Sequence, residues 1–109
     1  MNILFIVKST DTENVTDVIR MTSAFLMEEG TSVKIWFLGA SLRSAEVREL
    51  ITDHIYDLLE AGAEVYVCKS KAIPFKEDLP SGLKHSTINY LTYLITDWAT
   101  PGSGHVITI

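Results

Sequence analysis

The sequence predicts an α/β fold in which a parallel sheet is covered by helices. Apolar runs rich in β-branched residues alternate with stretches whose apolar residues recur at helical spacing, in the order strand, helix, strand, helix, strand. The connections between them are short, which favours right-handed crossovers and therefore parallel strands. No linker, internal repeat or low-complexity run interrupts the chain, so residues 1–109 are expected to form a single domain.

The first part of the chain predicts two strands separated by a helix. Residues 2–8 are a near-continuous apolar run, which is typical of a strand buried on both faces. Thr10 and Glu13 then have the spacing of a capping box, and apolar residues at helical spacing follow until Gly30, which is expected to end the helix. Residues 32–38 return to the composition of a strand.

A second helix and a third strand lead to the only cysteine of the chain. The helix is expected to begin at Ser41 or Ser44 and to end at Gly62. The β-branched and aromatic residues 65–67 then predict a strand that runs out at Cys68. The thiol is thus expected at the carboxyl end of a strand, which is where open α/β sheets bind their ligands.

The last third of the chain is expected to contain a loop, a helix and two further strands. Residues 72–82 include two prolines and a glycine and predict a long loop, which would serve as a lid or a subunit contact. A short edge strand is expected over Leu83–His85. Residues 88–98 have helical spacing, and residues 105–109 predict a closing strand.

The composition indicates an oligomeric protein of the cytoplasm. Hydrophobic residues make up 47% of the chain and charged residues 21%, which suggests that other subunits cover part of its surface. The net charge of −5 argues against binding to nucleic acid. The apolar N-terminal run is too short to span a membrane and lacks the features of a signal peptide. No spacing of metal ligands and no nucleotide-binding motif occurs, so neither a metal nor a cofactor is expected.

Cys68 is the strongest candidate for a functional residue. Lys69 and Lys71 follow it directly, and cations close to a sulfur stabilise the thiolate, which is the nucleophilic form. The alternative is a structural role, because a free cysteine is commonly a small apolar filler of the core. A single cysteine allows no disulfide within the chain.

Four further residues are candidates for the surroundings of this thiol. Arg43 follows the second strand and is expected at the same edge of the sheet, and His85 would face Cys68 from its own subunit or from a neighbour. Ser9 and Thr10, in the first loop, loosely resemble the hydroxyl-rich phosphate loop of flavodoxins. The loop contains no glycine and its acidic residues would repel an anion, so capping of the helix is the favoured explanation of Ser9 and Thr10. His105 is expected at the opposite end of the sheet.

Taken along the chain, these strands, helices and the cysteine resemble the DsrE/DsrF-like family, which includes sulfur-relay subunits of the TusD type and YchN-like proteins. The sharpest element of the resemblance is Gly62-x-x-Val65-x-x-Cys68. The resemblance also rests on the N-terminal strand and on three stretches: 33–40, 58–71 and 106–109.

The resemblance implies a three-layer α/β/α sandwich, with a mostly parallel sheet of about five strands in a flavodoxin-like topology. It implies trimers or hexamers of this chain or of related subunits. In the family's sulfur-handling members, the cysteine at this strand end takes sulfur from a donor as a persulfide and passes it to an acceptor, which assigns that role to Cys68. Many relatives have a second cysteine where this chain has Lys71, so disulfide chemistry within the chain is excluded here.

Three functions are therefore open from the sequence. The first is a sulfur-relay protein, and hence a possible sulfurtransferase, that carries a persulfide on Cys68. The second is a non-catalytic subunit of an assembly, in which Cys68 is packing. The third is a flavodoxin-like binder of a small molecule that uses Ser9, Thr10 and Thr12.

Overall fold

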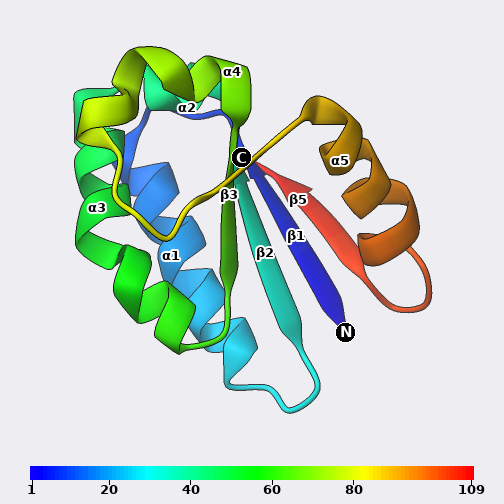
Figure 1. Cartoon of the computed structure of the whole chain (residues 1–109). Helices are drawn as coiled ribbons and strands as arrows, with labels where there is room; N and C mark the ends of the chain where they lie inside the picture. The colour runs from blue at the N-terminus through cyan, green and yellow to red at the C-terminus, as the bar shows by residue number, and fades with distance from the viewer.

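The centre of the computed structural model, which describes all 109 residues, is a sheet of five parallel strands in the order β4-β3-β2-β1-β5 (Figure 1). The strands are β1 (Asn2–Val7), β2 (Ser32–Phe37), β3 (Glu64–Cys68), β4 (Lys84–Ser86) and β5 (His105–Thr108). The predicted α/β fold class is thereby confirmed, and the sheet is wholly parallel. All five strands end at the same edge, where Cys68 is the last residue of β3.

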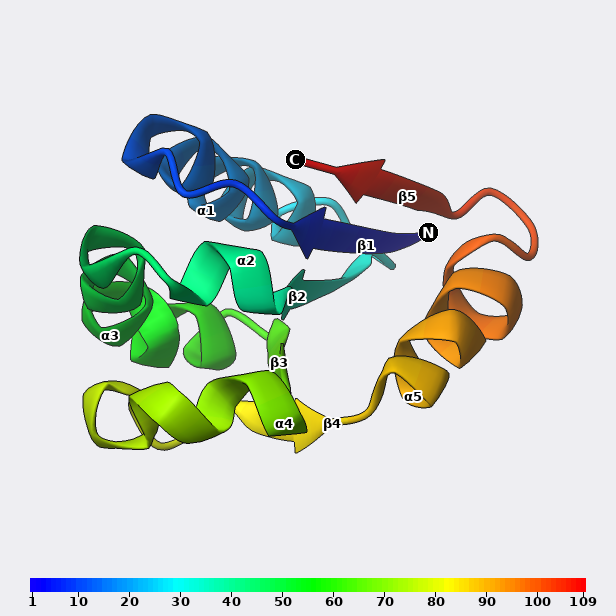
Figure 2. The same cartoon turned by 90° about the horizontal axis from the view of Figure 1, so that it is seen from above.

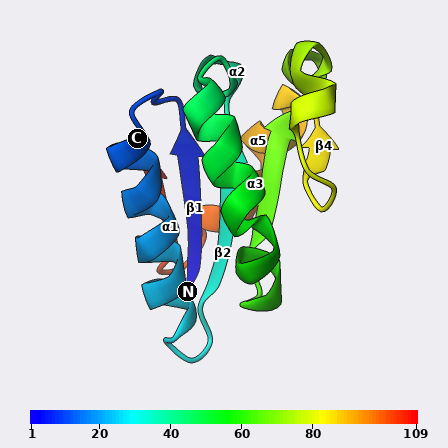
Figure 3. The ribbon, with the colours of Figure 1, turned by 90° about the vertical axis from the view of Figure 1, so that its left-hand side faces the viewer.

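Helices cover both faces of the sheet, but unequally. Helices α1 and α3 lie on one face and α5 lies on the other (Figures 1 and 2). Figure 3 looks onto this first face, where α1 and α3 lie in front of the sheet and run alongside its strands. The helices are α1 (Thr12–Leu26), α2 (Gly39–Leu42), α3 (Ala45–Glu60), α4 (Lys69–Ala72), the 3-10 helix η1 (Ile73–Asp78), α5 (Ile88–Tyr93) and the π-helix η2 (Leu94–Ala99).

The alternation of side chains along each strand divides the core into two parts. Odd-numbered residues of β1 and β2 and residues Val65 and Val67 of β3 pack toward α1 and α3, in a core of 19 buried residues. Their neighbours in the sequence, among them Tyr66 and Cys68, belong to a second core of only 8 buried residues on the α5 face. The candidate thiol therefore lies on the thinly covered face of the sheet.

The caps of the two long helices differ in how well the sequence predicts them. Ser44 caps α3 by accepting a hydrogen bond from the Val47 amide at 3.2 Å, so the later of the two predicted starts is confirmed. The predicted capping box at Thr10 is wrong, because Asp11 caps α1 by accepting from the Glu13 amide at 2.8 Å. The helix ends at Leu26, four residues before Gly30.

The predicted loop over residues 72–82 is wrong for most of its length. The chain turns into α4 directly after Cys68 and continues as η1 to Asp78. Pro74 does not prevent this, because it occupies the first turn of η1, where a missing N–H is tolerated. The predicted edge strand is confirmed as β4, although it is one residue later than expected.

The return to β5 depends on a close approach of two backbone segments. A side chain at Gly104 would place its Cβ 1.5 Å from the carbonyl oxygen of Ala99 and 2.9 Å from that of Asn2. Only a glycine fits there, because no residue with a Cβ avoids the clash. The predicted helix over residues 88–98 is present, but its second half is the π-helix η2.

None of the helices combines the length with the apolar character that crossing a bilayer requires.

Candidate functional site

Cys68 lies where β3 passes into α4, and it is buried, with 9% of its surface exposed. Ser86 of the edge strand β4 is its partner in the register, so both side chains lie on the α5 face. The position at the carboxyl end of a parallel strand agrees with the sequence-based prediction.

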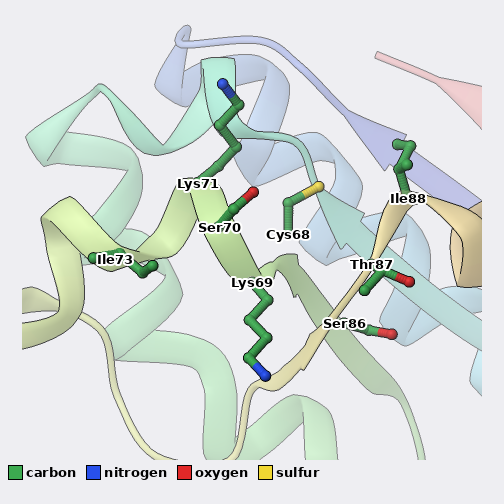
Figure 4. Close-up of a pocket in the computed structure, with 8 residues that line it drawn as sticks. All are labelled: Cys68, Lys69, Ser70, Lys71, Ile73, Ser86, Thr87 and Ile88. Atoms are coloured by element: carbon green, nitrogen blue, oxygen red, sulfur yellow. The ribbon is translucent and has the colours of Figure 1, made fainter.

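Cys68 lines the largest of five cavities in the structure, which has a volume of about 580 Å³. The walls come from α4, the start of η1 and the segment that leads from β4 into α5 (Figure 4). The lining residues are Cys68, Lys69, Ser70, Lys71, Ile73, Ser86, Thr87 and Ile88. The thiol is therefore next to a space that could admit a small sulfur compound or the end of a partner's side chain.

The sulfur of Cys68 accepts a hydrogen bond from Trp36 of the neighbouring strand β2. Trp36 is completely buried, and its Nε1 lies 3.2 Å from Cys68 Sγ. Its indole ring stacks on the ring of Tyr66, with centroids 5.1 Å apart and an angle of 5° between the planes. Sequence reasoning missed this residue. The signal was present only in combination, because Trp36 and Tyr66 pair across the sheet, two residues before the cysteine.

The ammonium groups of Lys69 and Lys71 point away from the sulfur, in opposite directions (Figure 4). The aliphatic stem of Lys71 packs on Gly39, where an added Cβ would meet the Cγ of the lysine at 2.7 Å. Both lysines line the cavity, but neither forms a hydrogen bond to Cys68. The polar contact to the sulfur thus comes from a neutral donor and not from the predicted cations.

A cluster of charged and aromatic groups lies next to Trp36 on the same face. Lys34 Nζ lies 2.7 Å from both carboxylate oxygens of Glu64, and Lys84 Nζ lies 3.8 Å from one of them. Burial opposes the ionisation of Glu64, but the hydrogen bonds and charge of Lys34, together with the charge of Lys84, outweigh it and lower the pKa of this carboxyl. The Tyr66 hydroxyl donates to Glu64 at 3.3 Å. Burial, followed by the neighbouring Tyr90 and the Glu64 charge, raises the pKa of Tyr66.

His85 does not share the cavity of Cys68. It pairs with Val67 in the register, so its side chain lies on the opposite face of the sheet from Cys68 and Ser86. It lines another cavity of about 220 Å³, which shares Lys69 and Ile73 with the cavity of Cys68. The predicted pair of Cys68 and His85 is therefore not formed within one chain.

Arg43 also lies outside the cavity of the thiol, although close to it. It lines a neighbouring cavity of about 380 Å³, which shares Ser70 and Lys71 with the cavity of Cys68. The structure thus brings Arg43 to the expected edge of the sheet, but not to the cavity of the thiol.

The first loop uses its polar groups internally. Ser9 Oγ accepts hydrogen bonds from the Asp11 amide at 3.0 Å and from Asn14 Nδ2 at 3.1 Å. The backbone amides of Lys8 and Ser9 both donate to the carbonyl oxygen of Ile109, at 2.7 and 3.2 Å. Neither Ser9 nor Thr10 lines any of the five cavities. The amides of Lys8, Ser9, Asp11 and Glu13, which a flavodoxin-like loop would offer to a phosphate, already have acceptors within the chain.

His105 begins β5 and pairs with Ile3, at the end of the sheet opposite to Cys68. No group of three or more His, Cys, Asp or Glu side chains is arranged to hold a metal ion.

Solved structures of similar fold identify the architecture. The ychN protein of E. coli superposes with a TM-score of 0.64 over the full length of both chains, at 15% sequence identity. Two proteins of unknown function, MTH1491 of Methanobacterium thermoautotrophicum and BT1422 of Bacteroides thetaiotaomicron, give TM-scores of 0.71 at 13% identity, with 99% of this chain covered. The chain therefore has a YchN-like fold. No family model matches the sequence, and no curated protein matches it either.

Proposed function

We propose that this protein is a sulfur-relay protein of the cytoplasm, which carries sulfur as a persulfide on Cys68 and passes it to a partner. The observation that carries the proposal is the position of the sole thiol. It lines the largest cavity, at the carboxyl end of a central strand, and a buried N–H donates to its sulfur. The resemblance of the sequence to the DsrE/DsrF-like family supports the same role.

The transfer requires only one cysteine and no external oxidant or reductant. In loading, the thiolate of Cys68 attacks the outer sulfur of a donor persulfide R–S–SH, the S–S bond of the donor breaks, and R–S⁻ leaves. The product is Cys68–S–SH. In unloading, the thiolate of an acceptor attacks the outer sulfur of Cys68–S–SH, and the bonding electrons return to Sγ as the thiolate. Each step conserves charge and the number of sulfur atoms.

The rim of the cavity supports contact with other proteins. Ile73 and Ile88 flank it and remain 67% and 55% exposed, although both are large apolar residues. Lys69 and Lys71 add positive charge, which suits an anionic persulfide. These residues would contact a donor, an acceptor, or another subunit in a trimer or hexamer of this chain or of related chains.

The test is to load the purified protein with polysulfide and to measure its intact mass. The wild type is expected to gain about 32 Da per sulfur atom and to lose this gain when a small thiol is added as acceptor. Cys68→Ser removes the only thiol and is expected to gain nothing. A wild type that gains no mass, under conditions in which a free cysteine peptide is loaded, contradicts the proposal.

A second candidate is a non-catalytic subunit of an assembly. It is favoured by the burial of Cys68 among the apolar residues of the α5-face core. In this case the thiol would react with iodoacetamide only when the protein unfolds, and Cys68→Ala would leave assembly unchanged. Rapid labelling of the folded protein at neutral pH would exclude this candidate.

A further inference from the structure

We propose that Trp36 stabilises the negatively charged sulfur of Cys68, and that Tyr66 is the positioning residue which holds the indole ring in place. The inference rests on the proposed function, because it assigns a role to Trp36 in the chemistry of that thiol. It starts from a single contact, the 3.2 Å hydrogen bond from Trp36 Nε1 to Cys68 Sγ.

The chemistry of the indole group limits what this contact can do. An indole N–H is only a donor, so Trp36 cannot take the proton of the thiol. It can only stabilise electron density on the sulfur. A thiol is a weak acceptor, whereas a charged acceptor makes the stronger hydrogen bond. The contact therefore favours Cys68 in a charged form over the neutral thiol.

Because Trp36 is buried, the protonation state of Cys68 also decides how well the indole N–H is hydrogen-bonded. Trp36 is fully buried, and Cys68 Sγ is the sole hydrogen-bond acceptor of its N–H. A buried N–H without a good acceptor costs stability. A neutral thiol satisfies this N–H poorly and a thiolate satisfies it well. A residue that served packing alone would not need a donor at this position.

The ring is held by contacts that do not involve the sulfur. Tyr66 pairs with Trp36 across the sheet and stacks against it with nearly parallel planes, 5.1 Å between centroids. The hydroxyl of Tyr66 donates to Glu64, and the ammonium group of Lys34 donates to both carboxylate oxygens of the same residue. The direction of the N–H is thus fixed before any sulfur compound arrives, which reduces the reorganisation needed at the reacting atom.

The same contact helps both steps of sulfur transfer. In loading, the N–H donates to the sulfur atom that attacks the donor and stabilises negative charge on it. During unloading, the bonding electrons of the S–S bond return to Sγ, and the N–H stabilises the charge that develops there. Trp36 itself gains and loses neither protons nor electrons.

The test compares two tryptophan-to-phenylalanine variants. Trp36→Phe removes the N–H and retains a ring that can stack on Tyr66. Trp98→Phe makes the same chemical change on the same face of the sheet, at a residue whose N–H is not hydrogen-bonded to the sulfur. The rate of Cys68 alkylation by iodoacetamide is measured against pH in both. In Trp36→Phe the rising part of the profile should move to higher pH, with the rate at pH 7 reduced about three- to tenfold. Trp98→Phe should follow the wild type.

A second measurement does not depend on the folding of Trp36→Phe. In Trp98→Phe, Trp36 is the sole tryptophan, so its emission reports directly on the neighbouring sulfur. The emission is expected to change with pH at the midpoint of the alkylation profile, and again when polysulfide is added. Trp98→Phe combined with Cys68→Ser should show neither change.

The outcomes separate this inference from the proposed function. A wild type that never takes up sulfur, but whose alkylation profile moves in Trp36→Phe, overturns the sulfur relay and supports the donor role of Trp36. A Trp36→Phe variant that loads, unloads and alkylates like the wild type overturns the donor role and leaves the relay standing. The donor role is also overturned if the emission of Trp36 changes neither with pH nor on alkylation of Cys68.

Discussion

Lys34 Nζ lies 2.7 Å from each carboxylate oxygen of Glu64, its direct partner on the neighbouring strand. The lysine also lies over the ring of Trp98, 4.8 Å from its centroid, so its ammonium group contacts both the Glu64 carboxylate and a residue of η2. This pair joins the helix on the thin face of the molecule to the strands that carry Trp36 and Cys68.

The lowered pKa of Glu64 predicts a dependence of stability on pH. Because the pKa is lower in the folded than in the unfolded chain, the contribution of Glu64 is present above its ordinary value of 4.5 and is lost as the pH falls through the folded value. Glu64→Gln should reduce the free energy of unfolding at pH 7 by up to about 1 kcal/mol and abolish this part of the acid sensitivity. Urea unfolding at a series of pH values measures both effects. Glu29→Gln, on the surface, is the control and should retain the wild-type dependence.

The lysines beside Cys68 are predicted to have little effect on its reactivity. Their ammonium groups point away from the sulfur into exposed surroundings, where water and salt screen their charge. Lys69→Gln and Lys71→Gln should each change the alkylation rate at pH 7 by less than about twofold. This is measured beside Trp36→Phe under the same conditions. A larger loss in either lysine variant than in Trp36→Phe would restore the sequence-based explanation.

Arg48 is predicted to hold η1 in place. Its side chain donates to the Leu42 carbonyl oxygen at 2.6 Å, stacks 4.4 Å above the ring of Phe75 and reaches Asp78 at 3.5 Å. Arg48→Ala should cost about 1–3 kcal/mol and accelerate hydrogen exchange over residues 73–79. Asp78→Asn, which removes only the exposed ion pair, should have a much smaller effect. Unchanged exchange in Arg48→Ala would show that η1 is held by other contacts.

Gly104→Ala is predicted to be among the most destabilising substitutions in the chain. The added Cβ would overlap the carbonyl oxygen of Ala99, which belongs to the backbone and cannot rotate away. We expect a loss of at least about 2 kcal/mol in thermal or urea unfolding. Gly30→Ala is the matched control, because its positive φ of 78° is strained but no atom lies within 4 Å of the added Cβ. It should cost about 1 kcal/mol.

The sequence predicts the central strands well because each is a nearly continuous apolar run, which can be recognised without knowledge of the strands it pairs with. Each central strand is buried on both faces, and this requirement is visible in the run itself. The start of α3 at Ser44 could likewise be predicted, because a helix cap depends on residues that are close in the sequence. The helical path from Lys69 to Asp78 could not be predicted in this way, since Pro74 and the charged residues around it resemble a loop, and the contact of Phe75 with Arg48 is not local.

The candidate site was predicted only in part, because its decisive contact is not local. Cys68 could be found as the sole thiol at a strand end. Trp36 is 32 positions away, and its role depends on the register between β2 and β3. His85 was expected near the thiol from its position in the sequence, but the pairing of β4 with β3 places it on the other face. The face that a side chain occupies is set by register, which a single sequence does not reveal.

Because side chains alternate along β3, the site depends on the number of residues in this strand as well as on their types. Val67 and Cys68 are neighbours in the chain, yet one lies in the large core and the other lines the cavity. Removing or adding one residue within β3 would turn the thiol toward α3 and separate it from Trp36, even if every side chain at the site were kept. A single-codon deletion or insertion could therefore move the thiol from one face of the sheet to the other, without any change in the residues that surround the cavity.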